Sequence, residues 1–346
     1  MRNKQSFQVT QSAIITFMSI ISNCTASAIQ DAAASLIAGN LVAFPTETVY
    51  GLGADACNKE AVARIYEVKG RPTDHPLIVH ISSTKHLDKW ASDIPEYAIK
   101  LARAFWPGPM TLVLPRTNLA KDFITGGQNN VGIRVPVHTV ALALLKDFEA
   151  QGGLGVAAPS ANRFGKVSPT CAEDVKEELS DFLGVNDLIL DGGPSLVGVE
   201  STIIDCTKGS PQILRPGGIT ATMINNLLDL SIEMDTKLST IQIKAPGLLE
   251  SHYSPTARVH LSGTPGPGDG FIAPSNFPTP KGVIRLMSPT SNQEYAKTLY
   301  QGLRLADSKK LTNVFVVPPV GDDIAVAICD RLTKSAFVKP KNTQTE

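Results

Sequence analysis

The stretch that decides the fold class is Leu41-Val42-Ala43-Phe44-Pro45-Thr46-Glu47-Thr48-Val49-Tyr50-Gly51-Leu52. Its first four residues are an apolar run that predicts a short buried strand. The chain then turns at once into a polar loop, and ligands of α/β sheets bind where strands end in such loops. Threonine hydroxyls in the loop suit a ligand, but they equally suit a local ST-turn, so the loop alone does not establish a site.

About twenty residues later, the run Lys69-Gly70-Arg71-Pro72 ends a predicted helix. Asn58 is placed to cap the start of that helix, and its apolar positions share one face. Two cations at a helix exit complement the helix dipole. They also suit the phosphates of a small polyanion, Arg71 as a planar fork and Lys69 as a point charge, and the run by itself leaves both interpretations open.

The remaining pattern alternates strands with helices and predicts an α/β domain over residues 28–230. Further strands are expected at 76–81, 110–114, 131–135, 154–158, 187–190, 201–205 and 212–214. Helices are expected at 96–105, at 140–148, and from a capping box of Thr170 and Glu173 to residue 179.

A change in composition after residue 230 predicts a linker at 231–258 and a smaller C-terminal α/β domain at 259–346. Strands at 283–287 and 314–317 and helices at 293–306 and 323–332 are expected there. The Gly- and Pro-rich residues 262–281 predict an exposed loop.

Composition excludes several classes of protein. The 346 residues suffice for two domains, and 32 basic residues balance 32 acidic ones, which gives no global field for nonspecific nucleic-acid or membrane binding. Five widely spaced cysteines without a Cys-x-x-Cys pair indicate neither a disulfide framework nor a zinc site, and they favour the cytoplasm. No segment is long and apolar enough to predict a membrane span.

The first residues allow two interpretations. Arg2, Lys4 and an apolar patch from Ala13 to Ile21 resemble a weak export or organelle-targeting segment. Polar residues interrupt the patch, so an N-terminal extension at 1–27 that leads to the first helix is the favoured hypothesis.

Several polar residues stand out within the apolar strands and at their ends. Arg134 lies in the strand at 131–135 and needs a carboxylate from a ligand or from an internal Asp or Glu, because burying a lone guanidinium is costly. His80 ends an apolar strand, where a packing role is the commoner one. Ser160 and Ser168 lie in loops where hydroxyls and helix-entry amides suit a phosphate.

The order of these motifs over residues 28–225 closely resembles the YrdC-like threonylcarbamoyl-adenylate synthases, and the C-terminal part resembles the long form of that family. The motifs that carry the resemblance are the 45–52 stretch, Lys69-Gly70-Arg71-Pro72, Phe105-Trp106-Pro107-Gly108-Pro109, Val131-Gly132-Ile133-Arg134, Ala157-Ala158-Pro159-Ser160-Ala161-Asn162, Gly198-Val199-Glu200-Ser201-Thr202 and Leu214-Arg215-Pro216-Gly217. The resemblance implies a twisted mixed sheet with helices around a concave basic site.

The same resemblance implies an enzyme that joins L-threonine, bicarbonate or carbon dioxide, and ATP with Mg²⁺ into L-threonylcarbamoyl-AMP, releasing pyrophosphate. The product would feed the N6-threonylcarbamoyl modification of adenosine 37 in tRNA, through a downstream threonylcarbamoyl transferase as partner. By this resemblance Lys69 and Arg71 are catalytic, and the residues that bind threonine are Thr48, His80, Arg134, Ala158 and Ser201. The residues that bind ATP are Arg71, His75, Asn130, Ser160, Ser168, Arg215 and Tyr253, and no protein metal ligand is implied.

Two positions depart from the family pattern, which commonly has Asn at His75 and often Thr at Asn130; both substitutes still form hydrogen bonds. His252 and Tyr253 in the linker suggest a lid that excludes water. Three alternatives remain. A double-stranded RNA-binding module is disfavoured by the neutral charge, although weak RNA binding is compatible. A single-domain relative of unknown activity is disfavoured by the linker and the C-terminal unit, and the third alternative is a carbamoyl transferase of the same fold. The transferase is disfavoured because the chain lacks the acylphosphatase and zinc-finger segments of that class.

Overall fold

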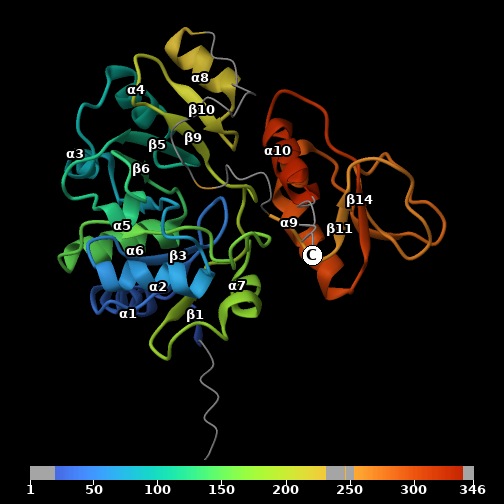
Figure 1. Ribbon diagram of the computed structural model, residues 1–346, viewed down its shortest axis with the longest axis horizontal. Coiled ribbons are helices and arrows are strands. Elements are labelled where there is room, and N and C mark those ends of the chain that lie inside the picture. The colour runs from blue at the N-terminus through green and yellow to red at the C-terminus, as the bar shows by residue number, and fades with distance from the viewer. Residues whose placement is uncertain (1–19, 231–245, 247–252, 338–346) are drawn as a thin grey trace, which may run out of the picture.

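The larger part of the protein is built on one mixed sheet. The computed structural model describes residues 20–230, Pro246 and residues 253–337. The strand order is β1-β8-β2-β3-β7-β4-β6-β5-β9-β10 (Figure 1). The strands are β1 (Ile20–Asn23), β2 (Val42–Phe44), β3 (Gly51–Asp55), β4 (Ile78–His80), β5 (Met110–Pro115), β6 (Asn130–Arg134), β7 (Val156–Ala157), β8 (Leu188–Asp191), β9 (Thr202–Asp205) and β10 (Gln212–Arg215).

The register of three central strands places two polar side chains together. β4 runs parallel to β6 with His80 opposite Arg134, and antiparallel to β7 with His80 opposite Val156. Side chains alternate between the faces of a strand, so Ile78 shares the face of His80. This face of the sheet therefore carries the candidate site.

Helices pack on both faces of this sheet. They are α1 (Ala26–Ile37), α2 (Lys59–Lys69), α3 (Leu87–Trp90), α4 (Glu96–Phe105), α5 (Asp122–Thr125), α6 (Thr139–Ala150), α7 (Ala172–Leu179) and α8 (Ala221–Leu228), with a short 3₁₀ turn η1 at Thr84–His86. Leu36 of α1 and Phe148 of α6 share a core with Phe44 and Val156, so these helices cover the site's face at one end of the sheet. Farther along, the same face carries a smaller apolar cluster of Ile78, Val113, Ile203 and Leu214.

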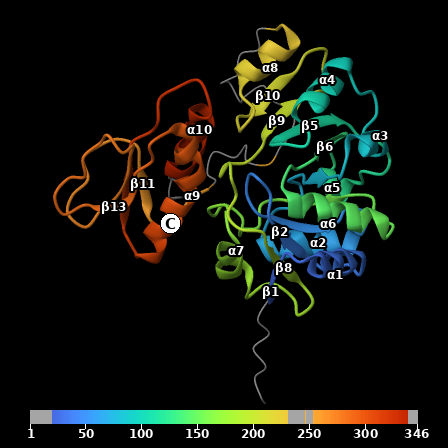
Figure 2. The same cartoon turned by 180° about the vertical axis from the view of Figure 1, so that it is seen from behind.

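A second, parallel sheet forms the C-terminal part, with strand order β11-β14-β12-β13. Its elements are β11 (Arg258–His260), β12 (Gly270–Ile272), β13 (Ile284–Met287), α9 (Asn292–Ser308), β14 (Asn313–Val316) and α10 (Ala325–Ala336). Helices α9 and α10 lie between this sheet and the larger part (Figures 1 and 2). Val49, Val167 and Val199 of the larger part belong to the core of α9 and α10, so the two parts pack against each other directly.

This architecture confirms the predicted mixed α/β sheet with a smaller second α/β part. The N-terminal elements begin earlier than expected, because β1 pairs with β8 and α1 starts at Ala26. Residues 1–19 and most of the predicted linker, including His252, lie outside the described residues. The boundaries at residues 28, 231 and 259 stay a prediction. No helix in the described ranges has the length and apolar character needed to cross a membrane.

Two local predictions are wrong. Helix α7 has no capping box of Thr170 and Glu173; it begins one residue later than expected, and the carboxylate of Asp174 accepts hydrogen bonds from N and Oγ1 of Thr170 (2.9 and 3.3 Å). Residues 262–281 are not simply a loop, because β12 lies inside the small sheet. Gly270 makes this strand hard to recognise, because glycine is uncommon inside strands. Glycine is needed there because a Cβ would lie only 2.8 Å from the side chain of Leu286.

Candidate active site

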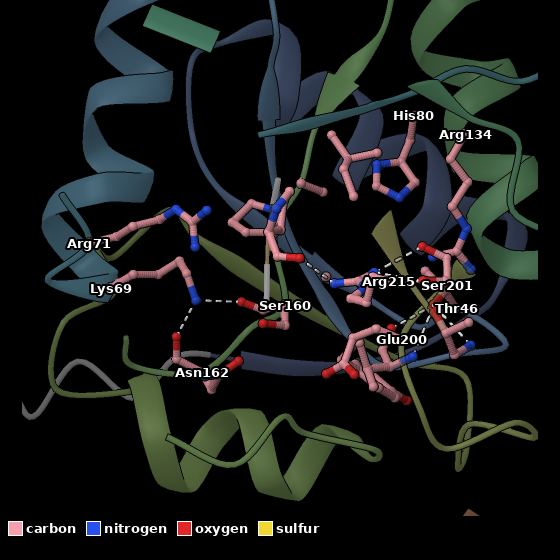
Figure 3. Close-up of a pocket in the computed structure, with 18 of the residues that line it drawn as sticks. Thr46, Lys69, Arg71, His80, Arg134, Ser160, Asn162, Glu200, Ser201 and Arg215 are labelled. Atoms are coloured by element: carbon pink, nitrogen blue, oxygen red, sulfur yellow. Dashed lines mark hydrogen bonds between the residues drawn. The ribbon is translucent and has the colours of Figure 1, made fainter. Parts of the chain in front are cut away.

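A single cavity of about 620 Å³ brings together loops that lie far apart in the sequence (Figure 3). The residues that line it are Thr46, Thr48, Val49, Tyr50, Gly51, Lys69, Arg71, Ile78, His80, Arg134, Ala158, Pro159, Ser160, Asn162, Phe164, Glu200, Ser201, Arg215, Pro246 and Tyr253. Four cationic side chains converge on it, as a binding site for a polyanion requires.

Lys69 lies on the side of the cavity formed by the end of α2. Gly70 takes a left-handed conformation (φ 60°) that ends the helix, and the side chain of Lys69 is buried. Its Nζ donates hydrogen bonds to the carbonyl oxygens of Ser160 (2.7 Å) and Asn162. Burial, together with the charge of Arg71, lowers the pKa of Lys69 well below its usual value. An anion beside Nζ would therefore stabilise the charged form.

Arg71 is also buried, although a cation at a helix exit is expected to be exposed to solvent. Nη2 donates to the carbonyl oxygen of Pro76 (3.0 Å), and the guanidinium lies 5.7 Å from the ring centroid of Phe164. Its Nε has no hydrogen-bond partner among the described residues. Burial lowers the pKa of Arg71 to about 10, so the side chain remains charged at neutral pH with unused donor capacity.

Arg134 lies on the opposite side of the cavity from Lys69 and Arg71 (Figure 3), and there it meets an internal carboxylate. Its Nη2 lies 2.6 Å from Oε1 of Glu47, and Oε2 of Glu47 accepts a hydrogen bond from the backbone N of Val137 (3.1 Å). Nε of Arg134 lacks a partner among the described residues. The question that the sequence left open is thus answered: Glu47 is the internal counter-ion, and Arg134 keeps a donor for a ligand.

His80 presents a neutral ring beside Arg134. It is buried, packs edge-on against Phe44 (centroids 6.0 Å apart), and its Nδ1 has no hydrogen-bond partner among the described residues. Burial, followed by the charge of Arg134, lowers its pKa to about 3. His80 therefore offers the cavity an uncharged imidazole, suited to a hydrogen bond with a polar ligand.

Ser201 and Arg215 form the wall between β9 and β10. Oγ of Ser201 lies 2.8 Å from Oγ1 of Thr111, and Nη2 of Arg215 donates to both the carbonyl oxygen (2.9 Å) and Oγ (3.1 Å) of Ser201. Nη1 of Arg215 donates to the carbonyl oxygen of Pro246 (2.9 Å). These bonds fix the direction of the guanidinium, as a preorganised anion site needs.

The polar loop after β2, which contains Thr46 and Thr48, forms a turn and also part of the cavity wall. Oγ1 of Thr46 donates to the carbonyl oxygen of Val49 (2.6 Å), and the backbone N of Thr48 donates to Oγ1 of Thr46 (3.2 Å). The two hydroxyls lie 2.8 Å apart. Thr46 thus holds the turn, and Thr48 lines the cavity beside it.

Glu200 is a carboxylate in the lining of an otherwise cationic cavity. Its oxygens accept hydrogen bonds from Ser168 (2.6 Å), Tyr300 (3.1 and 2.9 Å) and Arg331 (2.8 Å). Burial alone would raise the pKa of Glu200, but the charges of Arg331 and Arg215 and these hydrogen bonds hold it at about 2. The group is therefore an anion at neutral pH.

Three of the predicted site residues lie outside the lining. Asn130 lines an adjoining hollow, which shares Ile78 and Pro246 with the cavity. His75 packs edge-on against Phe164 (5.3 Å between centroids). Ser168 is buried and donates to Glu200. The other predicted residues line the cavity.

Some of the residues that line the cavity are not among those predicted from the sequence. Asn162 and Glu200 stand in the same motifs as the predicted residues Ser160 and Ser201, so the sequence did indicate that these segments reach the site. Thr46 was indicated too, as the first hydroxyl of the polar loop. Nothing in the sequence indicated Phe164 or Pro246, because they contact the cavity only through tertiary folding.

Two family models match consecutive parts of the chain. The family described as "Telomere recombination" matches residues 34–217. The family described as "Threonylcarbamoyl-AMP synthase, C-terminal domain" matches residues 219–337. Together the two matches include every described residue that lines the cavity.

Curated relatives are similar over nearly the whole chain. A threonylcarbamoyl-AMP synthase of Pyrococcus abyssi is 47% identical over 89% of this chain and 94% of its own length. One of Bacillus subtilis is 39% identical over 89% of this chain and 92% of its own length. The crystal structure of P. abyssi Sua5 complexed with L-threonine superposes with a TM-score of 0.82 at 37% identity, covering 92% of this chain and 98% of that one.

Proposed function

Because this chain belongs to the threonylcarbamoyl-AMP synthase family, we propose that it makes L-threonylcarbamoyl-AMP from L-threonine, bicarbonate or carbon dioxide, and ATP. The observation that carries the proposal is the cavity itself. It brings together the buried side chains of Lys69, Arg71, Arg215, Arg134 and His80. Two anionic substrates require such a paired arrangement of cations and neutral polar groups.

The reaction proceeds in two balanced steps. The amine of threonine attacks carbon dioxide, loses a proton and becomes a carbamate. A carbamate oxygen then forms a bond to the α-phosphorus of ATP, and the bond from that phosphorus to the bridging oxygen breaks, so pyrophosphate leaves with its electron pair. Such transfer depends on positioning and charge stabilisation more than on a covalent nucleophile.

Threonine binds on the side of Thr48, His80, Arg134, Ala158 and Ser201. Arg134 takes the carboxylate with donors that Glu47 leaves available, since Nε has no partner among the described residues. His80 is neutral because its pKa lies near 3, so it offers a hydrogen bond and does not compete for the carboxylate as a charge. Ala158 leaves room beside the strand end for the substrate backbone.

ATP binds beside threonine, with its phosphates between Lys69, Arg71 and Ser160 on one side of the cavity and Arg215 on the other. Lys69 keeps one N–H beyond the two that it gives to loop carbonyls, and Arg71 keeps its Nε. These donors stabilise the charge that leaves with pyrophosphate. His75 and Asn130 contribute from the edges of the cavity, and Tyr253 closes it from the linker side.

Mg²⁺ enters with ATP in this proposal. Within residues 20–230 and 253–337, no group of three or more His, Cys, Asp or Glu side chains is arranged to hold a metal ion. The one carboxylate among the described residues that line the cavity, Glu200, already accepts four hydrogen bonds. These residues fit a metal carried by the phosphates and not a protein metal site. Bound there, Mg²⁺ supplies neutralisation of phosphate charge.

The product is the substrate for N6-threonylcarbamoylation of adenosine 37 in tRNA. A separate transferase that consumes the adenylate is therefore the expected partner, with at most weak binding of RNA by this chain. The five cysteines are all free, which supports a reducing compartment such as the cytoplasm.

The decisive experiment incubates the purified protein with ATP, Mg²⁺, labelled bicarbonate and L-threonine. Pyrophosphate release that requires threonine, with the carbon label recovered in a nucleotide product, is the expected result. Omission of threonine or of bicarbonate serves as the control. ATP hydrolysis that is indifferent to threonine would contradict the proposal.

A further inference from the structure

Glu200 is held from the C-terminal part of the protein. The hydroxyl of Tyr300 on α9 donates to both of its carboxylate oxygens, and Nε of Arg331 on α10 donates to Oε2. Tyr300 and Arg331 are both 0% exposed. A wall residue of the cavity thus takes most of its hydrogen bonds from residues 100 and 131 positions away in the sequence.

Arg331 contacts three segments of the cavity wall at once. Besides Glu200, its Nη2 donates to the carbonyl oxygen of Pro216 (3.0 Å), next to Arg215, and its guanidinium lies 5.3 Å from the ring centroid of Tyr253. Tyr253 in turn stacks on Tyr300, with centroids 5.7 Å apart and planes at 25°. One buried cation therefore connects the anionic residue, the β10 exit and the linker tyrosine.

A negative charge in this position opposes the proposed chemistry unless it is neutralised. The phosphates of ATP and the carboxylate of threonine are both anions, and like charges in a low-dielectric cavity repel strongly. Figure 3 shows Glu200 on the same side of the cavity as Ser201 and Arg215. Without another counter-ion, Glu200 has Arg215 as a nearby cation to attract, which would remove Arg215 from the substrate.

We propose that Arg331 and Tyr300 are positioning residues for ATP binding: they neutralise and fix Glu200, so that Arg215 stays available to the phosphates. The inference rests on the proposed function for the identity of its ligand. It gives the C-terminal part a defined electrostatic task in a cavity formed mainly by the larger part. The surrounding charges fit this assignment, because Asp330 lies 2.5 Å from Nη1 of Arg331 and is itself held by Lys334 (2.8 Å).

The test compares ATP affinity in Arg331→Met, Glu200→Gln and the double variant, by titration with ATP and by the KM for ATP. Arg331→Met should weaken ATP binding about tenfold, or about 1.4 kcal/mol, because Glu200 would then attract Arg215 away from the phosphates. The double variant should recover most of that loss, since it removes both charges together. A double variant that binds ATP no better than Arg331→Met would overturn the proposal.

Arg304→Met is the matched control. It tests whether weaker packing between the two parts of the protein is enough to raise the KM for ATP. Arg304 on α9 also bridges them, because its Nη2 donates to the carbonyl oxygen of Val167 (2.6 Å) and Nη1 lies 3.5 Å from Glu178, but it does not line the cavity. We expect a lower melting temperature with an unchanged KM for ATP. An equal rise in KM for ATP in Arg304→Met would show that docking alone explains the effect, and would overturn the inference.

Tyr300→Phe keeps the test open if Arg331→Met does not fold. It removes only the hydroxyl that donates to Glu200 and keeps the ring that stacks on Tyr253. We expect a rise in the KM for ATP of about threefold, or about 0.7 kcal/mol; an unchanged KM for ATP would overturn the proposal. The proposed function itself is tested separately. It would be wrong if the unaltered protein released no pyrophosphate in response to threonine.

Discussion

Glu47 and Arg134 form a buried ion pair, with Oε1 of the carboxylate 2.6 Å from Nη2 of the guanidinium and side-chain exposures of 4% and 5%. The pair means that the cavity does not present Arg134 as a free cation. A ligand carboxylate joins a guanidinium whose charge is already partly balanced. Removal of one partner from a buried pair leaves the other uncompensated, which costs about 3 kcal/mol of stability.

Glu47→Gln should therefore lower the melting temperature of the ligand-free protein and enlarge the stabilisation that threonine gives. The substrate carboxylate would then supply the only anion for Arg134. Thermal melts with and without saturating threonine measure both effects. Asp187→Asn is the control, because Asp187 pairs with Arg64 at 2.5 Å outside the cavity. It should lower stability and leave the threonine-induced shift unchanged, and an unchanged shift in Glu47→Gln would contradict the assignment of Arg134.

Lys69 and Arg71 are not expected to be interchangeable. Nζ of Lys69 fits between two loop carbonyls, and the guanidinium of Arg71 lies beside Phe164 with one bond to Pro76. Lys69→Arg and Arg71→Lys keep the charge and lose this geometry. We expect each to lower kcat/KM for ATP about 100-fold, or about 2.7 kcal/mol, in the pyrophosphate-release assay.

Arg163→Lys is the control for the preceding pair of variants. Arg163 lies in the same region, where Nη1 donates to the carbonyl oxygen of Val68 (2.6 Å) and the guanidinium packs on Phe182 (4.1 Å). It does not line the cavity. Turnover within about twofold of the unaltered protein is expected; a loss as large as that of Arg71→Lys would mean that the helix end, and not phosphate binding, sets the rate.

The sequence predicts the fold best where apolar runs are continuous. β4 and β5 are predictable because nearly all of their residues are buried and form a continuous apolar run. β3 was missed, since Gly51 and Gly53 read as turn signals. Glycine is required at 53 because a Cβ there would lie 2.8 Å from the ring of Phe44. That constraint exists only after the strands have paired.

The sequence likewise predicts some features of the site and not others. Arg134 could be predicted to need an anion, because a guanidinium inside an apolar strand has no other reason to be buried. Its partner Glu47 could not, since the two are 87 positions apart and no spacing rule connects them. Glu200 shows the same limit, because Tyr300 and Arg331 reach it only through the packing of α9 and α10.

Acid should destabilise the protein through His80. Its pKa is about 3 when folded, below its ordinary value of 6.5, because of burial and then Arg134. As the pH falls, His80 is protonated in the unfolded chain before it is protonated in the folded protein. The free energy of unfolding therefore falls between pH 6.5 and 3, by up to about 1.4 kcal/mol per pH unit. Glu200, with a pKa lowered from 4.5 to about 2, adds a loss only between pH 4.5 and 2.

His80→Gln should reduce the pH dependence of stability between pH 6.5 and 5. The measurement is the midpoint of urea unfolding at several pH values. His138→Gln is the matched control. Burial also lowers the pKa of His138, but its side chain is only half-buried, so its removal should flatten the curve less. An unchanged slope in His80→Gln would show that its neutral buried ring does not govern the acid response.

Asn130 provides a test of the nucleoside end of the site. It lines the hollow that adjoins the cavity, together with Ile78, Val113 and Ile203, whose apolar surfaces suit a flat purine. Asn130→Ala should raise the KM for ATP about fivefold, or about 1 kcal/mol, by loss of a hydrogen bond, and leave the KM for threonine unchanged. Asn129→Ala is the control, because Asn129 lines a different surface groove beside Arg116. Equal effects of the two variants, or a change confined to threonine, would place the nucleoside elsewhere.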